Sequence, residues 1–521
     1  MRLKFPVPRG AARALPRATA AAIAFALHAA GAQAQNALSV DPDPAAGTVP
    51  LRTLDARVRL GGERVHLPGG ERMGLVGLTE LLNVGGEFWF GPGVYGAASG
   101  RRGGLFVPGF EGAWSHPFGE LLAIDTGLFV GGGGGANAPV GGGLMLRPHI
   151  DLVFRLPGFY TGPTWSKVYF PSGRINSNQV GWMLNVDSSF RYRPAAFTGA
   201  ATDGSATGLG FDHVDAMATF AKPRGSRNTS GAPLTNRIGL VGLRAERQVD
   251  GPLWAGIETA GAASGGVAGY AEALGTAGLR FPVVGDRLTL DLRASAGLGG
   301  GGAIDTGGGL LVKAAAGATL KVTDTLAIGL EAGVVDAPRH AHYKAATGAI
   351  ALNWALDVPS ADLGNWSSTR AGVPTKMEFS TGVERYRAAR RDGGTRPLEA
   401  VVLQMSRFVA PGLYVTGEAQ SAYAGGAGAY SVGLFGLGGQ LPVTHGLSVG
   451  VEALAGAAGG GGVDTQGGAI VQGRAYIDAA LTDSLSLRVG AGKVKSLHGG
   501  LDAPVVDAAL VFRFGVDRAR R

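Results

Sequence analysis

Few residues in the sequence could form a catalytic site, and their spacing suits catalysis poorly. Ser496 and His498 lie close to Asp502, so the three residue types of a hydrolytic triad occur in one short stretch. A triad needs a nucleophile, a base and an orienting acid that converge in space, and sequence neighbours at this spacing do not form one. We therefore expect no enzymatic activity and assign no catalytic residue.

The metal-binding and phosphate-binding patterns are incomplete as well. His340 and His342, near Asp336, supply two imidazoles on one side of an extended loop, but zinc-like sites need a third ligand. The segment GGGGVD at 459–464 begins like a calcium-binding nonapeptide, yet Gln466 stands where an apolar residue is needed. No glycine run is followed by Lys-Ser or Lys-Thr, as a phosphate-binding loop requires. We expect no cofactor and no resident metal.

Composition excludes several protein classes. The chain has 521 residues, 91 glycines and no cysteine, so disulfide scaffolds and zinc–thiolate sites are ruled out. The formal charge is +8, but five of the basic residues lie in the first 17 positions, which leaves 42 basic against 39 acidic residues elsewhere. This balance does not predict a nucleic-acid partner.

The amino terminus has the pattern of a cleavable export signal. Residues 1–17 form a basic flank, Ala18–Leu27 form a short apolar core, and Ala32-Gln33-Ala34 supply the small residues that a signal peptidase accepts. An uncleaved anchor is the alternative, but ten apolar residues are half of what a membrane-spanning helix needs. We predict a signal peptide over 1–34, cleaved after Ala34.

Three similar units follow the signal. RMGLVGL at 72–78 returns as RIGLVGL at 237–243, and GAASG at 96–100 returns at 261–265, both at an offset of 165. Glycine-rich stretches recur at 131–145, 297–311 and 459–470. Internal matches of this kind indicate a repeated architecture. We predict repeats over 50–197, 212–357 and 374–517, linkers over 35–49, 198–211 and 358–373, and a basic tail over 518–521.

Within each unit the hydrophobic period is two. In LTLDLRASAGL at 288–298, Leu290 and Leu292 share one face while Asp291 and Arg293 share the other, which is typical of a strand. Such segments recur about every 20 residues, giving about eight strands per unit and about 24 in all. Tight turns alternate with long loops. A soluble β-sandwich or propeller is the alternative to a membrane barrel.

These features resemble the Gram-negative outer-membrane β-barrel class. The resemblance rests on the export signal, the absence of cysteine, the alternating strands and the last strand, ALVFRF at 509–514, which looks like the signal read by the barrel-insertion machinery. It implies an all-β, transmembrane, antiparallel up-and-down barrel in the outer membrane. It also implies outer-membrane lipid, lipopolysaccharide and the insertion machinery as partners, with no nucleic acid.

The strand phase assigns side chains to the two faces. Residues predicted to line the lumen are Asp125, Asp291, Arg293, Glu452, Arg474, Asp478, Arg488, Asp507 and Arg513. Loop residues predicted at the mouth are Asp305, Asp464, Arg390 and Arg391. Interfacial aromatic residues are predicted at Trp89, Trp182, Trp254 and Trp354.

The strands could close in two ways, as one barrel of about 24 strands or as three tandem eight-stranded barrels. A small barrel must fill its core with side chains. The inward face of the second unit is small, with alanine or glycine at Ala315, Gly317, Ala327, Gly329, Ala349 and Ala351. This favours one wide barrel, although ion pairs among the charged residues of the third unit could fill a narrow one.

A wide lumen predicts a polar pore or an export conduit for an unidentified small solute or exported polymer. The alternative is a non-conducting structural or adhesive surface barrel whose long loops bind a partner.

Overall fold

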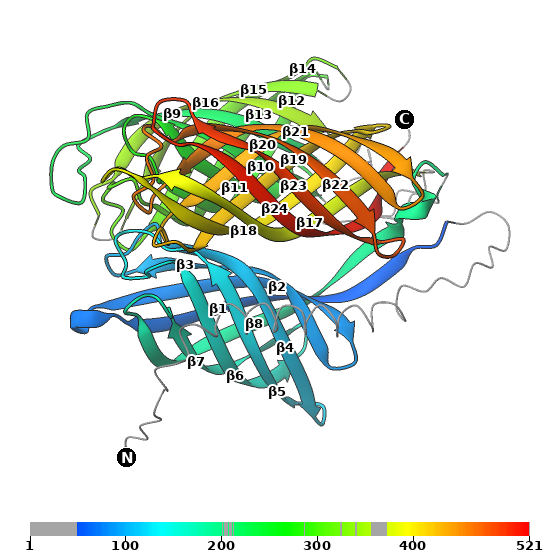
Figure 1. The fold of residues 1–521 in the computed structure, drawn as a ribbon, viewed down its shortest axis with the longest axis horizontal. Helices are drawn as coiled ribbons and strands as arrows, with labels where there is room; N and C mark the ends of the chain where they lie inside the picture. Colours follow the sequence, from blue (N-terminus) through cyan, green and yellow to red (C-terminus); the bar gives the residue numbers. More distant parts are fainter. Residues whose placement is uncertain are drawn as a thin grey trace.

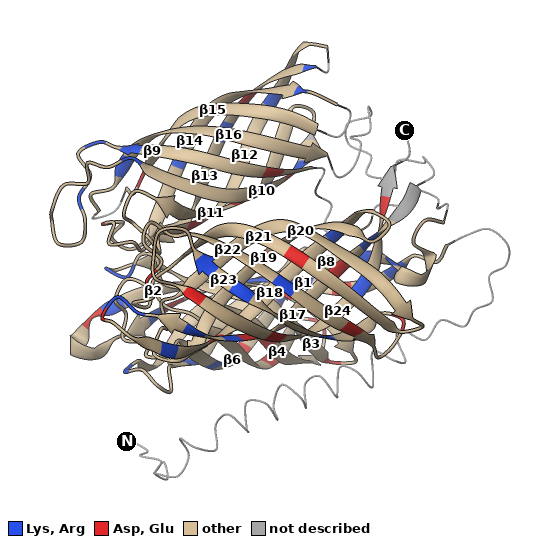
Figure 2. Ribbon diagram, turned by 45° about the horizontal axis from the view of Figure 1, so that its top comes forward, with Lys and Arg blue, Asp and Glu red and all other residues tan. Residues whose placement is uncertain are grey.

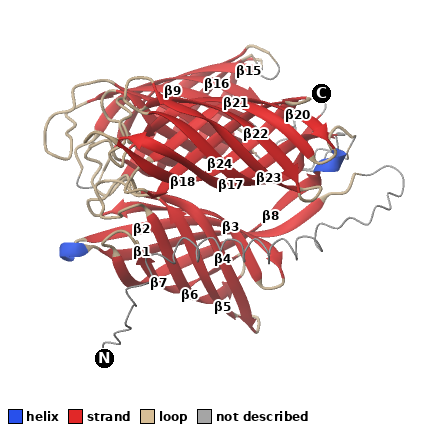
Figure 3. Ribbon diagram, viewed as in Figure 1, coloured by secondary structure: helices blue, strands red, loops and turns tan. Residues whose placement is uncertain are grey.

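The computed structural model describes residues 49–519, except 201, 203–206, 208–210, 212, 286, 324–325, 339–340 and 356–371. It contains 24 antiparallel strands, as predicted, and two short 3-10 helices, η2 (Pro68–Gly70) and η3 (Ala195–Phe197). Strands dominate the molecule, and long loops gather at one end (Figure 3). The predicted signal peptide, 1–34, lies outside the described residues.

The strands close into three barrels rather than one. The first strand of each group of eight pairs with the last: β1 with β8, β9 with β16, and β17 with β24. The preference for a single wide barrel is therefore wrong, and the alternative of three eight-stranded barrels is correct (Figure 1).

The strand bounds are as follows. Barrel 1 consists of β1 (Arg52–His66), β2 (Arg72–Gly85), β3 (Phe88–Ser99), β4 (Phe106–Phe118), β5 (Leu122–Gly132), β6 (Leu144–Leu156), β7 (Phe159–Tyr169) and β8 (Asn176–Pro194). Barrel 2 consists of β9 (His213–Pro223), β10 (Ile238–Asp250), β11 (Leu253–Ser264), β12 (Ala271–Val284), β13 (Leu288–Gly300), β14 (Leu310–Lys321), β15 (Leu326–Asp336) and β16 (Lys344–Ala355). Barrel 3 consists of β17 (Gly372–Ala389), β18 (Thr395–Ala410), β19 (Leu413–Ala424), β20 (Ser431–Thr444), β21 (Leu447–Gly459), β22 (Ala469–Ala480), β23 (Leu485–Ser496) and β24 (Asp502–Ala519).

Side-chain alternation places apolar residues outside and polar residues inside. On β13, Leu290 and Leu292 are exposed on the outer wall, whereas Asp291 and Ser295 are buried in the interior. The period of two drives this arrangement because successive side chains on a strand point to opposite faces. Tight turns follow the even strands inside each barrel, and the longer connections lie at the opposite end, which we call the loop end.

The barrels form a ring in which each touches the next in the same way. The third strand of one barrel packs against the fifth strand of another: β3 against β13, β11 against β21, and β19 against β5. Barrels 1 and 3 also meet at the tight-turn end, where β8 and β24 share a short ladder around Arg193 and Gly515. Arg193 there forms an ion pair with Asp517 at 2.9 Å.

Glycine makes these contacts close. Gly143, Gly309 and Gly468, which follow the loops after the fifth strands, have φ angles of 99°, 97° and 98°. A Cβ atom on any of them would lie closer than 3.0 Å to a carbonyl oxygen of the neighbouring barrel, that of Ala422, Ala97 or Ala262 respectively. The matched glycine-rich stretches thus lie at equivalent places in the three barrels.

Candidate functional site

All nine residues predicted to line a lumen lie inside barrels, but not inside one lumen. Asp125 is in barrel 1, Asp291 and Arg293 are in barrel 2, and the other six are in barrel 3. Seven of the nine are buried, and the side chains of Arg293 and Arg513 are 7% and 15% exposed. Bands of charged residues appear along the strands in Figure 2.

In barrel 3, Arg474 bridges two walls of the interior. Its guanidinium donates to Glu418 and to Glu452, each at 2.6 Å. The hydroxyl of Tyr414 donates to Glu452 at 2.6 Å, and Gln404 donates to the same carboxylate at 3.1 Å. These groups cross the barrel, so the middle of the interior is filled by hydrogen-bonded side chains.

A second network in barrel 3 lies nearer the tight turns. Arg488 donates to Glu378 at 2.6 Å and to Asp478 at 2.8 Å. Arg513 also donates to Asp478, and Lys376 forms an ion pair with Glu378 at 2.8 Å. Buried charges are tolerated when they are paired and hydrogen-bonded in this way.

Barrel 2 shows why small inward residues do not make it hollow. Ala315 and Gly317 line one wall, and long side chains from the opposite strands occupy the space before them. Arg244 reaches Glu331 as well as Asp215, the latter at 2.8 Å. Arg293 pairs with Glu246 at 2.8 Å. The small residues make room for arginines that cross the interior, which is the physical reason that the wide-barrel prediction fails.

Barrel 1 has a similar interior that sequence reasoning largely missed. Arg59 donates to Glu111 at 2.6 Å and also pairs with Asp151. Arg147 forms a bidentate pair with Glu63 at 2.9 and 3.0 Å. The sequence did carry a signal for this interior. Arg57, Arg59 and Glu63 are separated by even numbers of residues, so they share one face of β1.

Two of the four predicted interfacial tryptophans point inward instead. Trp89 stacks under the guanidinium of Arg57 at 4.4 Å, and Trp254 under that of Arg280 at 4.2 Å. Each tryptophan is an even number of residues from an interior residue of its own strand, so its side chain points to the interior. Trp182 lies on the outer wall with 56% of its surface exposed, and Trp354 faces a cavity between the barrels.

The loop end of each barrel is closed by an apolar cap. Loop residues fold inward over the charged interior and are buried, among them Leu67, Leu105, Val140, Phe170 and Ile175 in barrel 1; Val267, Tyr270, Ile304 and Tyr343 in barrel 2; and Ala427, Tyr430, Val463 and Leu501 in barrel 3. Burial raises the pKa of Tyr270 well above its ordinary value, and Glu272 adds to the rise. Burial likewise raises the pKa of Tyr343 and of Tyr430.

Three of the four residues predicted at the mouth form hydrogen bonds or an ion pair with loop residues, and so hold the loops in place. Arg390 is buried and donates to the carbonyl oxygens of Gly461 at 3.0 Å and Gly425 at 2.9 Å. Asp305 pairs with His342 at 2.7 Å. Asp464 accepts from the backbone nitrogen of Gly500 at 3.0 Å. Arg391 is exposed, so only this residue faces solvent as an entrance residue would.

The residues considered for catalysis or metal binding are engaged otherwise. The Ser496 hydroxyl donates to the carbonyl oxygen of Thr465 at 2.7 Å, and Asp502 pairs with Lys493. His340 lies outside the described residues.

His213, Asp215 and Glu246, a cluster that sequence reasoning missed, bring three potential metal-ligand atoms within 4.8 Å of one another inside barrel 2. Arg244 holds Asp215 at 2.8 Å, and Arg293 holds Glu246 at 2.8 Å. Because guanidinium groups already neutralise both carboxylates, the cluster suits an ion-pair network rather than a cation.

The outer wall is apolar along the strands. On barrel 2, for example, the large apolar residues Leu330, Ile350 and Leu292 have exposed fractions of 58%, 52% and 54%. Among the described residues, no helix is both long enough and apolar enough to cross a bilayer. Large contiguous apolar surface of this kind marks contact with a partner or with lipid.

No protein-family model and no curated relative matches the chain. Solved structures that overlap it include the ferric enterobactin receptor PfeA of Pseudomonas aeruginosa, with 10% identity, a TM-score of 0.27, and coverage of 90% of this chain and 81% of that one. The siderophore receptor PirA of Acinetobacter baumannii gives the same four values. The NanC porin overlaps 57% of this chain and 98% of its own, with 8% identity and a TM-score of 0.15. These low scores carry no argument about function.

Proposed function

We propose that the protein is an integral outer-membrane protein in which three copies of one eight-stranded unit anchor and brace the loop-end surface without conducting solutes. The observation that carries this proposal is the filled interior. In each barrel, charged side chains are paired across the middle, and an apolar cap covers the loop end. Eight strands enclose an interior just wide enough for side chains to fill.

The outer wall supports a membrane location. Strands of 11 to 19 residues meet or exceed the roughly 9–11 residues that a tilted transmembrane strand needs. Their outward side chains are aliphatic over most of this length, while the charges are turned inward. An export signal cleaved after Ala34 and recognition of 509–514 by the insertion machinery belong to the same proposal.

The loop end supports an anionic partner. Exposed basic residues there include Arg64, Arg72, Arg101, Arg174, Lys222, Arg224, Arg237, Arg387, Arg391 and Lys495. Several acidic residues of this end are already paired, such as Glu71 with Arg102 and Asp392 with Arg396. A cationic surface beside the outer leaflet suits the phosphate groups of lipopolysaccharide.

A wide pore or export conduit is the competing function, and electrical recording separates the two. Purified full-length protein is inserted into planar bilayers, with flotation of proteoliposomes in parallel to verify insertion. We expect proteoliposomes that float with the lipid and bilayers that show no stable current steps. Reproducible open-channel steps from inserted protein would refute the non-conducting anchor, and protein that fails to float would refute the membrane location.

A further inference from the structure

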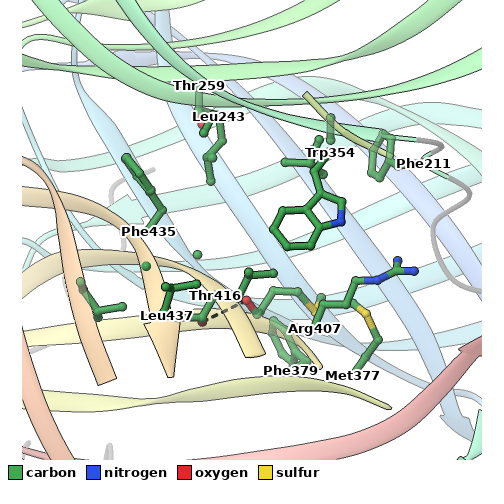
Figure 4. A pocket seen from close by; sticks show the side chains of 18 of the residues that line it. Phe211, Leu243, Thr259, Trp354, Met377, Phe379, Arg407, Thr416, Phe435 and Leu437 are labelled. Atoms are coloured by element: carbon green, nitrogen blue, oxygen red, sulfur yellow. Dashed lines mark hydrogen bonds between the residues drawn. The ribbon is translucent and has the colours of Figure 1, made fainter. Parts of the chain in front are cut away.

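A cavity of 1320 Å³ lies between the three barrels, outside all of their interiors. Its wall contains Leu82 and Pro92 from barrel 1, Leu243 and Trp354 from barrel 2, and Phe435 and Leu437 from barrel 3. In Figure 4, Leu243 and Trp354 face Phe379, Phe435 and Leu437 across this space. These six side chains lie on the outer surfaces of the barrels, the surface that the proposed function places against lipid.

The barrels also touch one another near the loop end. A Cβ atom on Gly96 would meet Leu298 of barrel 2 at 2.7 Å, and one on Gly132 would meet Tyr423 of barrel 3 at 3.0 Å. At these two places the backbone of one barrel lies against a side chain of the next. At the tight-turn end, Phe211 and Phe190 line the lower part of the cavity.

We propose that this cavity is a phospholipid site, in which acyl chains fill the space between the barrels and the phosphate lies near Arg407. The volume exceeds the roughly 300–1,000 Å³ of ordinary small-molecule pockets. A space this large with an aliphatic and aromatic wall is costly to leave empty and offers water few partners. Acyl chains match both the wall chemistry and the membrane surroundings.

The charges on the wall agree with an anionic headgroup. Arg407 is the outward-facing cation of the cavity wall at the tight-turn end, whereas Lys493 and Lys495 lie at the loop end of β23, where Lys493 is paired with Asp502. Arg407 lies three residues before the end of β18 at the tight-turn side, beside Met377 and Phe379 in Figure 4. An arginine at the edge of an apolar chamber is suited to hydrogen-bond a phosphate.

This inference rests on the membrane location in the proposed function, and its test reads the two separately. Full-length protein is extracted in mild detergent, washed extensively, and analysed by native mass spectrometry with lipid identification. Leu437→Trp places extra bulk in the cavity, and Leu487→Trp adds the same bulk to a Leu on the outer wall of barrel 3 that is exposed and does not line the cavity. Flotation of each variant reports membrane insertion independently.

We expect at least one tightly held phospholipid per wild-type chain, reduced retention in Leu437→Trp and wild-type retention in Leu487→Trp. Arg407→Gln should lower retention, and Arg407→Lys should restore part of it. Lipopolysaccharide or detergent alone in the washed wild type would overturn the assignment, as would equal retention in both tryptophan variants. If the protein floats but holds no phospholipid, the lipid site fails while the membrane location stands.

Discussion

Gly143 of barrel 1 lies against the carbonyl oxygen of Ala422 in barrel 3 so closely that a Cβ atom has no room between them. The pairs Gly309 with Ala97 and Gly468 with Ala262 repeat this relationship at the two other junctions. Each junction is therefore a backbone-to-backbone contact between barrels. Because each barrel contacts one neighbour through its third strand and the other through its fifth strand, three contacts close the ring.

Gly143→Ala should loosen the junction between barrels 1 and 3. The new methyl group meets the Ala422 carbonyl, which costs about 1–3 kcal/mol of overpacking, and its positive φ adds about 1 kcal/mol or more. Thermal unfolding of the purified protein, followed by circular dichroism, measures the loss.

Gly119→Ala is the matched control, because Gly119 has a φ of 75° and nothing within 4 Å of a Cβ atom. It should show the backbone strain alone. Equal destabilisation by the two variants would contradict the importance of the close contact.

Arg474→Ala should be among the most damaging single changes in barrel 3. It leaves the buried carboxylates of Glu418 and Glu452 without their common partner, which typically costs about 3–5 kcal/mol. Arg385→Ala breaks an ion pair with Glu399 in which the arginine side chain is 66% exposed, so we expect a change below about 1 kcal/mol. Denaturant unfolding in detergent compares the two variants, and similar midpoints would contradict a filled, ion-paired interior.

Alkaline pH should open the caps. The pKa values of Tyr270, Tyr343 and Tyr430 are raised by burial, so their neutral forms are favoured in the folded protein. Their contribution is fully present below the ordinary tyrosine pKa near 10 and is lost as pH rises above it, by up to about 1.4 kcal/mol per pH unit per tyrosine. Tyrosinate absorbance and loop proteolysis should rise together, and Tyr270→Phe should move the opening of barrel 2 to higher pH. Titration of all three tyrosines near pH 10 without increased proteolysis would contradict the caps.

The local pattern predicted the strands and their faces but not their closure. The alternation around Asp291 and Arg293 fixes which side chains point inward, and it is the same in a wide barrel as in a narrow one. Closure depends on β1 pairing with β8 rather than with a strand of another unit, and no short segment encodes that choice.

The filling of barrel 2 was hidden for a related reason. Ala315 and Gly317 look like the wall of an empty space until Arg244 is placed opposite them, and its partner Glu331 is 87 residues away. The same applies to Trp254, which looks interfacial as an isolated aromatic residue. Its parity with Glu258 was the signal that it points inward.

Arg390 offers a test of whether the loop end is held shut. Its guanidinium joins the loop after β17 to carbonyl oxygens of the loops after β19 and β21, and a charged hydrogen bond contributes about 1.5–3 kcal/mol. Arg390→Ala should therefore free these loops and speed their cleavage by protease added outside intact cells, while Arg391→Ala, which removes an exposed neighbour, should not. Bilayer recordings of Arg390→Ala should stay silent, because the networks of Arg474 and Arg488 still fill the interior beneath. A channel that appears on loss of Arg390 alone would mean that the cap, and not the ion-paired interior, is the barrier to solutes.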